Sequence, residues 1–384
     1  MTTEPILPGA TIGILGSGQL GRMLALEARN MGYGVRVFSG ERDTPCGQIA
    51  DAEIVGDYRD GEAVRAFAQT VSVVTYEFEN VPSETVVAIE AVGTPVRPGA
   101  GVLHVAQNRL REKEFFRSLG IATAPFVRVD SEATAASAFR DLQSPAILKT
   151  AASGYDGKGQ RTVRSEAEAQ AAFRGFGAVE CVLEGFVDFA WEGSVVAARG
   201  VGGDFADYGF VRNEHANHIL DVTTAPAPDV LPTLTEGAIH ATHTVMERLA
   251  VVGVLCVEFF VTAQGELVAN EMAPRPHNSG HWTTDGAITS QFEQQLRAVC
   301  GLPLGSTEMY LPGSAIANLL GDLWVGGEPD FGGMLSEYPD VKLHLYGKRE
   351  ARAGRKMGHL SLNGNSPELA YERVIAARAR LHHQ

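Results

Sequence analysis

The N-terminal part of the chain consists of short apolar runs separated by amphipathic segments. Apolar runs predict three strands, at residues 11–15, 34–38 and 72–76. Residues 22–31 predict a helix, and Val96 with Pro98 suggests a fourth strand. Strands that alternate with helices are typical of a doubly wound parallel sheet. We therefore predict an α/β, Rossmann-like domain over residues 1–107.

The middle of the chain has a different pattern. Residues 108–119 predict an amphipathic helix, and short strands are then predicted at 146–149, 162–164 and 180–186. Residues 254–271 predict two strands around the turn 263–266. We expect a central α+β domain over 108–305, with a lid subdomain at about 120–187. Several Gly and Pro breaks then suggest a small C-terminal domain over 306–384.

Composition excludes several classes of protein. The 384 residues are 45% hydrophobic and carry a net charge of -14, which argues against nucleic-acid binding. No apolar run approaches the ~18 residues of a membrane span, and the start does not resemble a signal peptide, so we expect a cytoplasmic protein. The four cysteines are widely spaced, which predicts reduced, mostly buried thiols rather than disulfides or a zinc site.

A glycine turn follows the first strand. Residues 16–21, Gly-Ser-Gly-Gln-Leu-Gly, match the dinucleotide fingerprint, in which backbone amides at a helix N-terminus meet phosphate. That reading also requires an acid at the end of the second strand, which instead ends Val37-Phe38-Ser39-Gly40. Three interpretations remain open: a dinucleotide site, a site for another phosphate ligand, and a purely structural turn.

A second glycine-rich segment lies just after the strand that carries Lys149. Residues 153–160, Ser-Gly-Tyr-Asp-Gly-Lys-Gly-Gln, can fold over a triphosphate while Lys149 contacts other phosphate oxygens. The segment is not a Walker loop, because the required Gly-Lys-Ser/Thr is absent. The alternative is a surface hairpin without a ligand.

Two carboxylates mark the predicted hairpin. If it closes symmetrically about Gln264-Gly265, Glu258 faces Glu271 across the two strands. Facing like charges are destabilising unless a cation lies between them, and oxygen ligands suit Mg²⁺. In the alternative interpretation a β-bulge shifts the register by one, so that one carboxylate is a solvated surface group.

Two further segments carry polar side chains suited to ligand binding. Residues 273–282 contain two prolines that forbid a helix, so Arg275, His277 and Asn278 lie on an ordered loop that can hold an anion or orient a substrate. The alternative is a rigid loop whose histidines cap backbone groups. In the tail, four cations within nine residues are enough to bind a phosphomonoester, although most such runs are solvated surfaces; they are Lys348, Arg352, Arg355 and Lys356.

In order along the chain, these motifs resemble the 5-(carboxyamino)imidazole ribonucleotide synthase family of ATP-grasp enzymes. The resemblance runs from about Ile12 to Leu360 and fades after Ser361. Six segments carry it: residues 16–23, 76–82, 154–160, 270–271, 274–282 and 354–359. The family usually has Arg-Pro-Gly-Arg-Lys where this chain has Arg352-Ala353-Gly354-Arg355-Lys356, so a turn restraint is lost but no charge.

The resemblance implies a set of nucleotide ligands. ATP would be held by Arg109, Lys149 and a loop comprising Gly154, Tyr155, Asp156, Gly157, Lys158, Gly159 and Gln160. Adenine would lie against Glu184, Gly185, Phe186 and Val187, with Glu192 on the ribose and His215 near the nucleotide. Magnesium would be bound by Glu258, Asn270 and Glu271, of which Asn270 and Glu271 also contact ATP.

The resemblance also implies a second substrate and a reaction. The phosphate of 5-aminoimidazole ribonucleotide would lie near Gln19, Lys348, Arg355 and Lys356, and its ring near Asp156, Arg275, His277 and Asn278. Bicarbonate would attack the γ-phosphorus of ATP, and the resulting carboxyphosphate would deliver CO₂ to the exocyclic amine. Lys149 and Arg275 would hold the anions, and Asp156 would orient the amine or take its proton. A homodimer is expected from the family.

Three alternatives differ in testable features. A formate-dependent glycinamide ribonucleotide transformylase shares the architecture, but residues 155–160 and 277–282 fit the carboxylase better. A nicotinamide oxidoreductase would select NAD. A catalytically silent nucleotide-binding regulator would be expected to have lost Glu258 or Glu271, and both are present.

Overall fold

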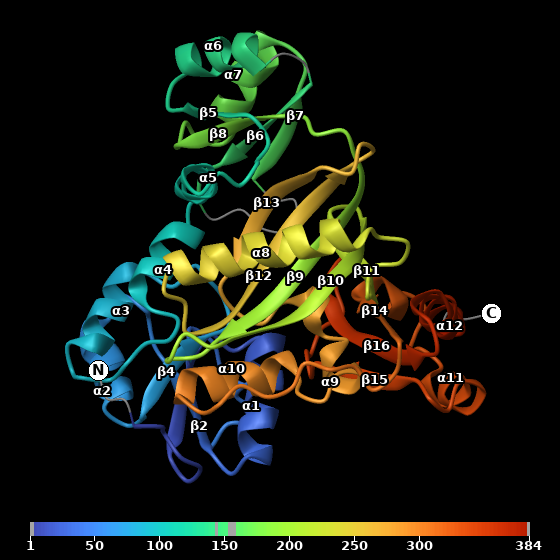
Figure 1. Ribbon diagram of the computed structural model, residues 1–384. Helices are drawn as coiled ribbons and strands as arrows, with labels where there is room; N and C mark the ends of the chain where they lie inside the picture. The colour runs from blue at the N-terminus through green and yellow to red at the C-terminus, as the bar shows by residue number, and fades with distance from the viewer. Residues whose placement is uncertain (1–3, 143–144, 153–158, 382–384) are drawn as a thin grey trace.

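The computed structural model describes residues 4–142, 145–152 and 159–381, and it has four parts (Figure 1). The first part is a parallel sheet of four strands in the order β3-β2-β1-β4. Its elements are β1 (Thr11–Leu15), α1 (Gln19–Asn30), β2 (Gly34–Ser39), β3 (Ala52–Val55), α2 (Gly61–Ala68), β4 (Val73–Tyr76), α3 (Ser83–Glu90) and α4 (Ala100–Ala106). The predicted parallel α/β domain is therefore confirmed.

One predicted strand of this sheet is wrong. Val96 makes only an isolated bridge to Val74, and the fourth strand is β3, which pairs with the opposite edge of the sheet. The β3 sequence, Ala-Glu-Ile-Val, is short and none of its residues is fully buried, so it lacks the apolar run that marks β1.

The second part stands at the top of Figure 1 and corresponds to the predicted lid. Its sheet is antiparallel, in the order β5-β8-β6-β7, and two helices cover it. Its elements are β5 (Phe126–Val129), α6 (Glu132–Leu142), β6 (Ala146–Thr150), β7 (Gln160–Val163), α7 (Glu166–Gly175) and β8 (Cys181–Gly185). The helix α5 (Arg109–Ser118), begun by the Asn108 side chain accepting from the Leu110 and Arg111 amides, leads into the lid.

The third and fourth parts share one antiparallel sheet of eight strands, in the order β13-β12-β9-β10-β11-β14-β16-β15. The central elements are β9 (Phe189–Arg199), β10 (Phe205–Ala216), β11 (Ile219–Ala225), α8 (Pro232–Arg248), β12 (Gly253–Thr262), β13 (Leu267–Ala273), the 3₁₀ helix η1 (Asn278–Gly280), α9 (Thr283–Gly286) and α10 (Gln291–Cys300). The C-terminal elements are β14 (Gly313–Leu320), the 3₁₀ helix η2 (Gly321–Trp324), α11 (Phe331–Glu337), β15 (Lys342–Leu345), β16 (Lys356–Gly364) and α12 (Pro367–Ala379). The strands of the expected C-terminal domain thus extend the central sheet.

Apolar packing joins the parts. The α8 helix packs on β9, β10 and β12, and its Ala238, Val245 and Met246 belong to a core cluster with residues of these strands. Helix α10 places Phe292 and Leu296 in the same cluster as Ile12 and Ile14 of β1, so it fixes the first domain to the central sheet. All four cysteines are buried and free, as predicted. Among the described residues, no helix is both long and apolar enough to cross a membrane.

Candidate active site

The glycine turn binds a carboxylate of the protein itself. Glu77, directly after β4, accepts the Gly18 amide with Oε1 and the Gly21 amide with Oε2, the second at 2.7 Å. A Cβ on Gly18 would lie 2.8 Å from Glu77 Oε1, so glycine is needed there for this close approach. Burial raises the pKa of Glu77, and the two amides oppose that rise. In this structure, two amides that the fingerprint would direct at a phosphate are paired with Glu77.

Glu79, two residues further on, holds the predicted anion-binding arginine. Arg275 Nε lies 2.6 Å from Glu79 Oε2, and its Nη1 donates to Pro276 O at 3.2 Å. Burial alone would raise the pKa of Glu79, but the Arg275 guanidinium outweighs this effect and the pKa is lowered. The same arginine and Lys348 of the tail both lower the pKa of Glu77, so the structure brings the first domain, the 273–282 loop and the tail to one place.

Lys149 lies in a buried triad of charges. Its Nζ is 2.9 Å from Glu184 Oε2, while Lys113 Nζ is 3.3 Å from Glu184 Oε1. Burial raises the pKa of Glu184, but Lys149 and Lys113 outweigh it and the pKa is lowered. Glu184 therefore forms ion pairs with two lysines. The sequence had predicted only that Glu184 lies near the adenine.

Sequence reasoning missed Lys113 and its neighbour Glu112. Lys113 occupies the buried stripe of α5 between Leu110 and Phe116, at the helical i, i+3 spacing, and that position was the available signal. Glu112 Oε1 accepts the Met272 amide of β13 at 2.6 Å, and burial followed by the Glu271 charge raises its pKa to about 8. Helix α5 thus contacts both the lid and the carboxylate hairpin.

The predicted pairing of Glu258 with Glu271 is confirmed, although the symmetric closure used to derive it is wrong. Next to the turn, Val261 pairs with Leu267 and Phe259 pairs with Ala269, so the register there differs from the predicted one by one residue. A β-bulge at Asn270 then restores the register, so Glu258 pairs with Glu271. Burial and the Glu258 charge raise the pKa of Glu271.

Further carboxylate and imidazole side chains surround Glu258. His277 Nε2 lies 3.1 Å from Glu258 Oε1, and His215 Nδ1 lies 3.2 Å from Glu192 Oε1. Ligand atoms of Glu192, His215 and Glu258 all lie within 4.8 Å of one another. The two carboxylates that face each other across the hairpin, Glu258 and Glu271, offer oxygen ligands, which Mg²⁺ prefers.

His277 also fulfils the structural alternative considered for its loop. Its Nδ1 accepts the Ser279 amide at 3.3 Å and so caps η1. Asn278 is 7% exposed, and among the described residues neither polar atom of its side chain has a hydrogen-bond partner.

The tail cations are partly paired with protein groups. Lys348 donates to Lys356 O at 2.7 Å and lies over the Tyr346 ring, and Arg355 Nη1 donates to Glu350 O at 3.0 Å. Arg352, which also forms an ion pair with Glu350, is 72% exposed. Gln48, in the loop before β3, donates to Gly347 O at 3.0 Å, so the first domain touches the segment that carries Lys348. Gln19 begins α1.

The remaining predicted nucleotide ligands lie at the lid. Arg109 Nη1 donates to Thr150 O at 3.2 Å, and Gln160 pairs with Lys149 across β6 and β7. Gly185 ends β8, Phe186 after it is 52% exposed, and Val187 follows. Gly159 has a positive φ of 71°. Five residues of the predicted loop lie outside the described residues: Gly154, Tyr155, Asp156, Gly157 and Lys158.

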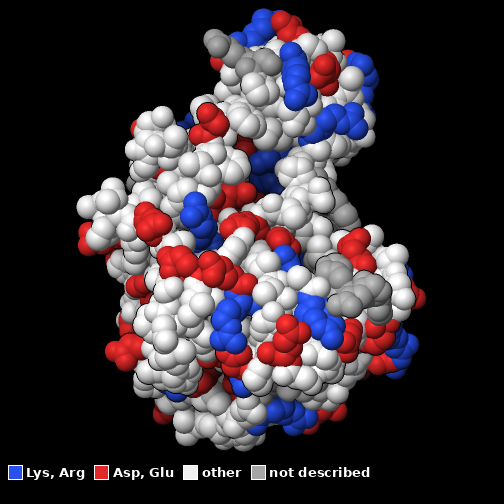
Figure 2. Space-filling model, turned by 90° about the vertical axis from the view of Figure 1, so that its right-hand side faces the viewer, with Lys and Arg blue, Asp and Glu red and all other residues white. Residues whose placement is uncertain are grey.

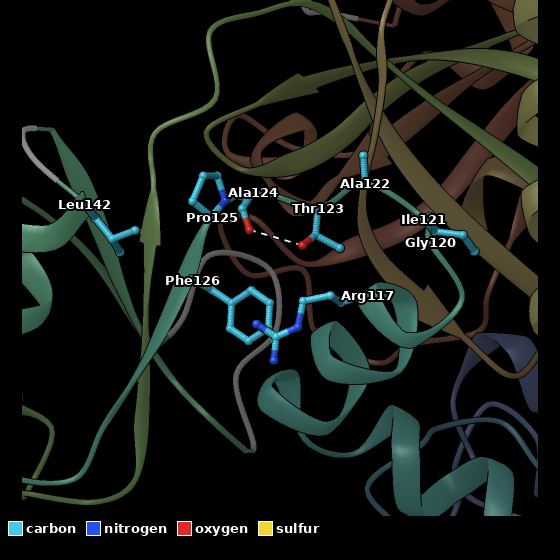
Figure 3. Close-up of a pocket in the computed structure, with 9 residues that line it drawn as sticks. All are labelled: Arg117, Gly120, Ile121, Ala122, Thr123, Ala124, Pro125, Phe126 and Leu142. Carbon is cyan, nitrogen blue, oxygen red and sulfur yellow. Dashed lines mark hydrogen bonds between the residues drawn. The ribbon is translucent and has the colours of Figure 1, made fainter.

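Figure 2 shows a hollow between the lid and the rest of the molecule, with acidic and basic side chains in its floor. A separate hollow of about 480 Å³ lies where α5 leads into β5 (Figure 3). Its lining is residues 120–126 with Arg117 and Leu142, and the Arg117 guanidinium lies 4.8 Å from the centre of the Phe126 ring. This second hollow contains none of the predicted site residues.

The fold and site define an ATP-grasp enzyme. The ATP-grasp domain model matches residues 114–292, the ribonucleotide synthetase preATP-grasp domain matches 9–107, and the phosphoribosylaminoimidazole carboxylase C-terminal domain matches 314–373. More specifically, the chain belongs to the N5-carboxyaminoimidazole ribonucleotide synthase family, as its sequence motifs predicted.

Individual relatives support this family. The enzyme of that name from Bacillus subtilis (strain 168) is 42% identical over 94% of this chain and 93% of its own length. The solved N5-carboxyaminoimidazole ribonucleotide synthetase from Thermus thermophilus is 43% identical with a TM-score of 0.88, covering 97% of this chain and 99% of that one. The Aspergillus clavatus synthase, solved with ADP and 5-aminoimidazole ribonucleotide, is 28% identical with a TM-score of 0.86, covering 97% and 98%.

Proposed function

We propose that this chain carboxylates the exocyclic amine of 5-aminoimidazole ribonucleotide, using ATP and bicarbonate and releasing ADP, in purine biosynthesis. The proposal is carried by the contacts of the Glu258–Glu271 pair: the Lys149 charge acts to lower the pKa of Glu271, and His277 of the 273–282 loop lies 3.1 Å from Glu258. The family to which the chain belongs bears this reaction in its name. The Aspergillus relative's complex with ADP and the ribonucleotide supports the same pair of ligands.

In this proposal, the lid and the hairpin hold the nucleotide. The buried Glu184 carboxylate, which is paired with Lys149, would orient Lys149 toward the phosphates. Arg109, Glu192 and His215 would line the nucleotide side. Mg²⁺, bound by Glu258, Asn270 and Glu271, would neutralise charge on the transferring phosphoryl group. The Gly154–Gln160 loop would cover the phosphates and exclude water, because carboxyphosphate is short-lived in solution.

The ribonucleotide would lie toward the first domain and the tail. Its phosphate would contact Gln19, Lys348, Arg355 and Lys356, and its ring would face Arg275, His277 and Asn278. The ion pair with Glu79 fixes Arg275 before any substrate arrives, which limits the reorganisation needed to bind an anion. Asp156 would orient the amine or take its proton. If the Asp156→Asn variant kept full product formation, this role would be excluded.

The deciding experiment measures ADP release with ATP, Mg²⁺ and bicarbonate, with and without 5-aminoimidazole ribonucleotide. ADP release that requires the imidazole ribonucleotide and yields an acid-labile carboxylated product supports the proposal. A parallel reaction contains formate and glycinamide ribonucleotide, and stimulation only there would overturn the substrate assignment while leaving the ATP-grasp class intact.

We also propose that the enzyme acts in the cytoplasm as a homodimer. The support for the homodimer is the family resemblance. Light scattering of the purified chain at micromolar concentration tests the dimer, and a mass of 41.0 kDa, that of one chain, would contradict it.

A further inference from the structure

A row of buried polar side chains leads from the central sheet to the ring of His277. Four residues form it, and none is more than 3% exposed: Thr223, Asn213, Ser194 and Ser279. They come from three neighbouring strands, β11, β10 and β9, and from η1. Buried polar groups at this density are costly unless each is satisfied, so the hydrogen bonds among them are informative.

The hydrogen bonds are continuous. Thr223 Oγ1 donates to Asn213 Oδ1 at 2.9 Å, and Asn213 Nδ2 donates to Ser194 Oγ at 2.9 Å. Ser194 Oγ and Ser279 Oγ are 2.7 Å apart, and Ser279 Oγ lies 2.8 Å from His277 Nδ1. The far edge of the same ring, Nε2, is 3.1 Å from Glu258 Oε1.

Asn213 Nδ2 donates to Ser194 Oγ. When Nδ1 of a neutral His277 ring accepts, Ser194 donates to Ser279 and Ser279 donates to Nδ1. An independent contact agrees, since the Ser279 backbone N–H can only donate and it points at Nδ1 from 3.3 Å. Both contacts hold the Nδ1 edge inward.

Glu258 acts on the same ring from the other side. Burial lowers the pKa of His277, but the Cys256 sulfur and the Glu258 carboxylate raise it to about 10, which favours a second proton. A proton on Nδ1 would be donated to Ser279 Oγ, so in either protonation state the Nδ1 edge faces Ser279 and the Nε2 edge faces Glu258. We therefore infer an orientation of the ring and not its charge.

We propose that Ser279, Ser194 and Asn213 are positioning residues for His277, which they hold with Nδ1 toward Ser279 and Nε2 toward Glu258. The inference rests on the proposed function, in which His277 contacts the ribonucleotide. Ser194 pairs with Glu258 across β9 and β12, so the same strands position both the carboxylate and the chain that aims the imidazole at it. A site built on strands in this way is held more rigidly than one on loops alone.

The test removes one hydroxyl at a time. Ser279→Ala and Ser194→Ala take out single oxygen atoms from buried positions, and Ser314→Ala is the matched control, because Ser314 is also fully buried and its hydroxyl makes only a 3.5 Å contact to Leu362 O. We expect the first two variants to lower kcat for carboxylation about 10-fold or more, with KM for ATP unchanged, since misplacing a group near the reacting atoms has effects of this order. The control should keep wild-type kcat.

A double-mutant cycle separates positioning from general destabilisation. In a His277→Asn background, Ser279→Ala should have no further effect on kcat, because the residue it positions is gone. An equal loss in both backgrounds, or wild-type kcat in Ser279→Ala, would overturn the inference. If His277→Asn alone leaves carboxylation unchanged, the proposed role of His277 fails, and the inference about its positioning fails with it. If carboxylation is absent in the wild type, the proposed function itself has failed.

Discussion

At the scale of single residues, Glu77 explains why the first domain has a dinucleotide-type turn without the ribose acid that dinucleotides need. Its carboxylate accepts hydrogen bonds from the Gly18 and Gly21 amides, which in the dinucleotide fingerprint would bind a ligand phosphate. The fingerprint could be read from the sequence, but its occupant could not. Glu77 lies 59 residues from Gly18, and only the strand order brings β4 beside β1.

Glu77→Gln should therefore destabilise the first domain. One oxygen that accepts an amide becomes an NH₂ group facing an N–H donor, and leaving a buried donor unsatisfied costs about 1–3 kcal/mol. Urea unfolding would measure the loss, with Glu90→Gln on the exposed end of α3 as the control. Equal stability of the two variants would mean that the amides do not depend on the carboxylate.

Glu112 provides a pH-dependent contribution to stability. The pKa of the Glu112 carboxyl is raised from its ordinary value of 4.5 to about 8 in the folded protein, so the folded state binds the proton more tightly than the unfolded state. The stabilisation is complete below about pH 4.5 and is lost as pH rises toward about 8. Glu112→Gln removes this titration and leaves an oxygen for the Met272 amide.

We thus expect Glu112→Gln to gain stability relative to wild type as pH rises between about 5 and 8. Urea unfolding in EDTA at several pH values measures the difference, and exposed Glu114→Gln on the same helix is the control. A difference that stays flat across this range would show that Glu112 is not held protonated.

At the scale of elements, the β12–β13 hairpin shows which structural features the sequence pattern predicts and which it does not. The two strands and the Glu258–Glu271 pairing were predictable, because alternation and turn residues are local signals. The position of the bulge, at Asn270, was not predictable, because the strand pairing that determines it is not a local signal. Likewise, the Lys113–Glu184–Lys149 triad joins three elements far apart in the sequence.

The facing carboxylates should make the hairpin depend on a cation. Without Mg²⁺, Glu271→Gln should stabilise the protein by about 0.2–1 kcal/mol, because it removes a like charge opposite Glu258. With millimolar Mg²⁺ the wild type should gain stability by mass action and the variant should gain less. Thermal unfolding with and without Mg²⁺ measures both effects, and an Mg²⁺ response unchanged by Glu271→Gln would exclude that carboxylate as a ligand.

At the scale of the whole molecule, the tail is part of the central sheet rather than an appendage. Strand β14 pairs with β11 over residues Val222 to Ala225, and β16 and β15 follow it outward. The Gly and Pro breaks indicated a small C-terminal domain, but they could not show that its strands join the central sheet, because they report local turns whereas sheet pairing is non-local. The arrangement also places Lys348, Arg352 and Arg355 on the loop between β15 and β16, and Lys356 at the start of β16, in the sheet that carries Glu258.

A shared sheet predicts that the central and C-terminal parts unfold together. Trp191 on β9 packs against Phe210, and Trp324 in η2 packs against Phe331, so each reports on one part. Two variants would each retain one of these tryptophans, with the other tryptophans changed to Phe. For each variant, the midpoint of urea unfolding followed by fluorescence should equal, within error, the midpoint followed by circular dichroism. Coincidence is expected because separating β14 from β11 would expose a long unpaired edge of the sheet. A Trp324 transition well before the circular-dichroism transition would instead mean that the tail folds as an independent unit, and the substrate site would then be assembled from two parts that can separate.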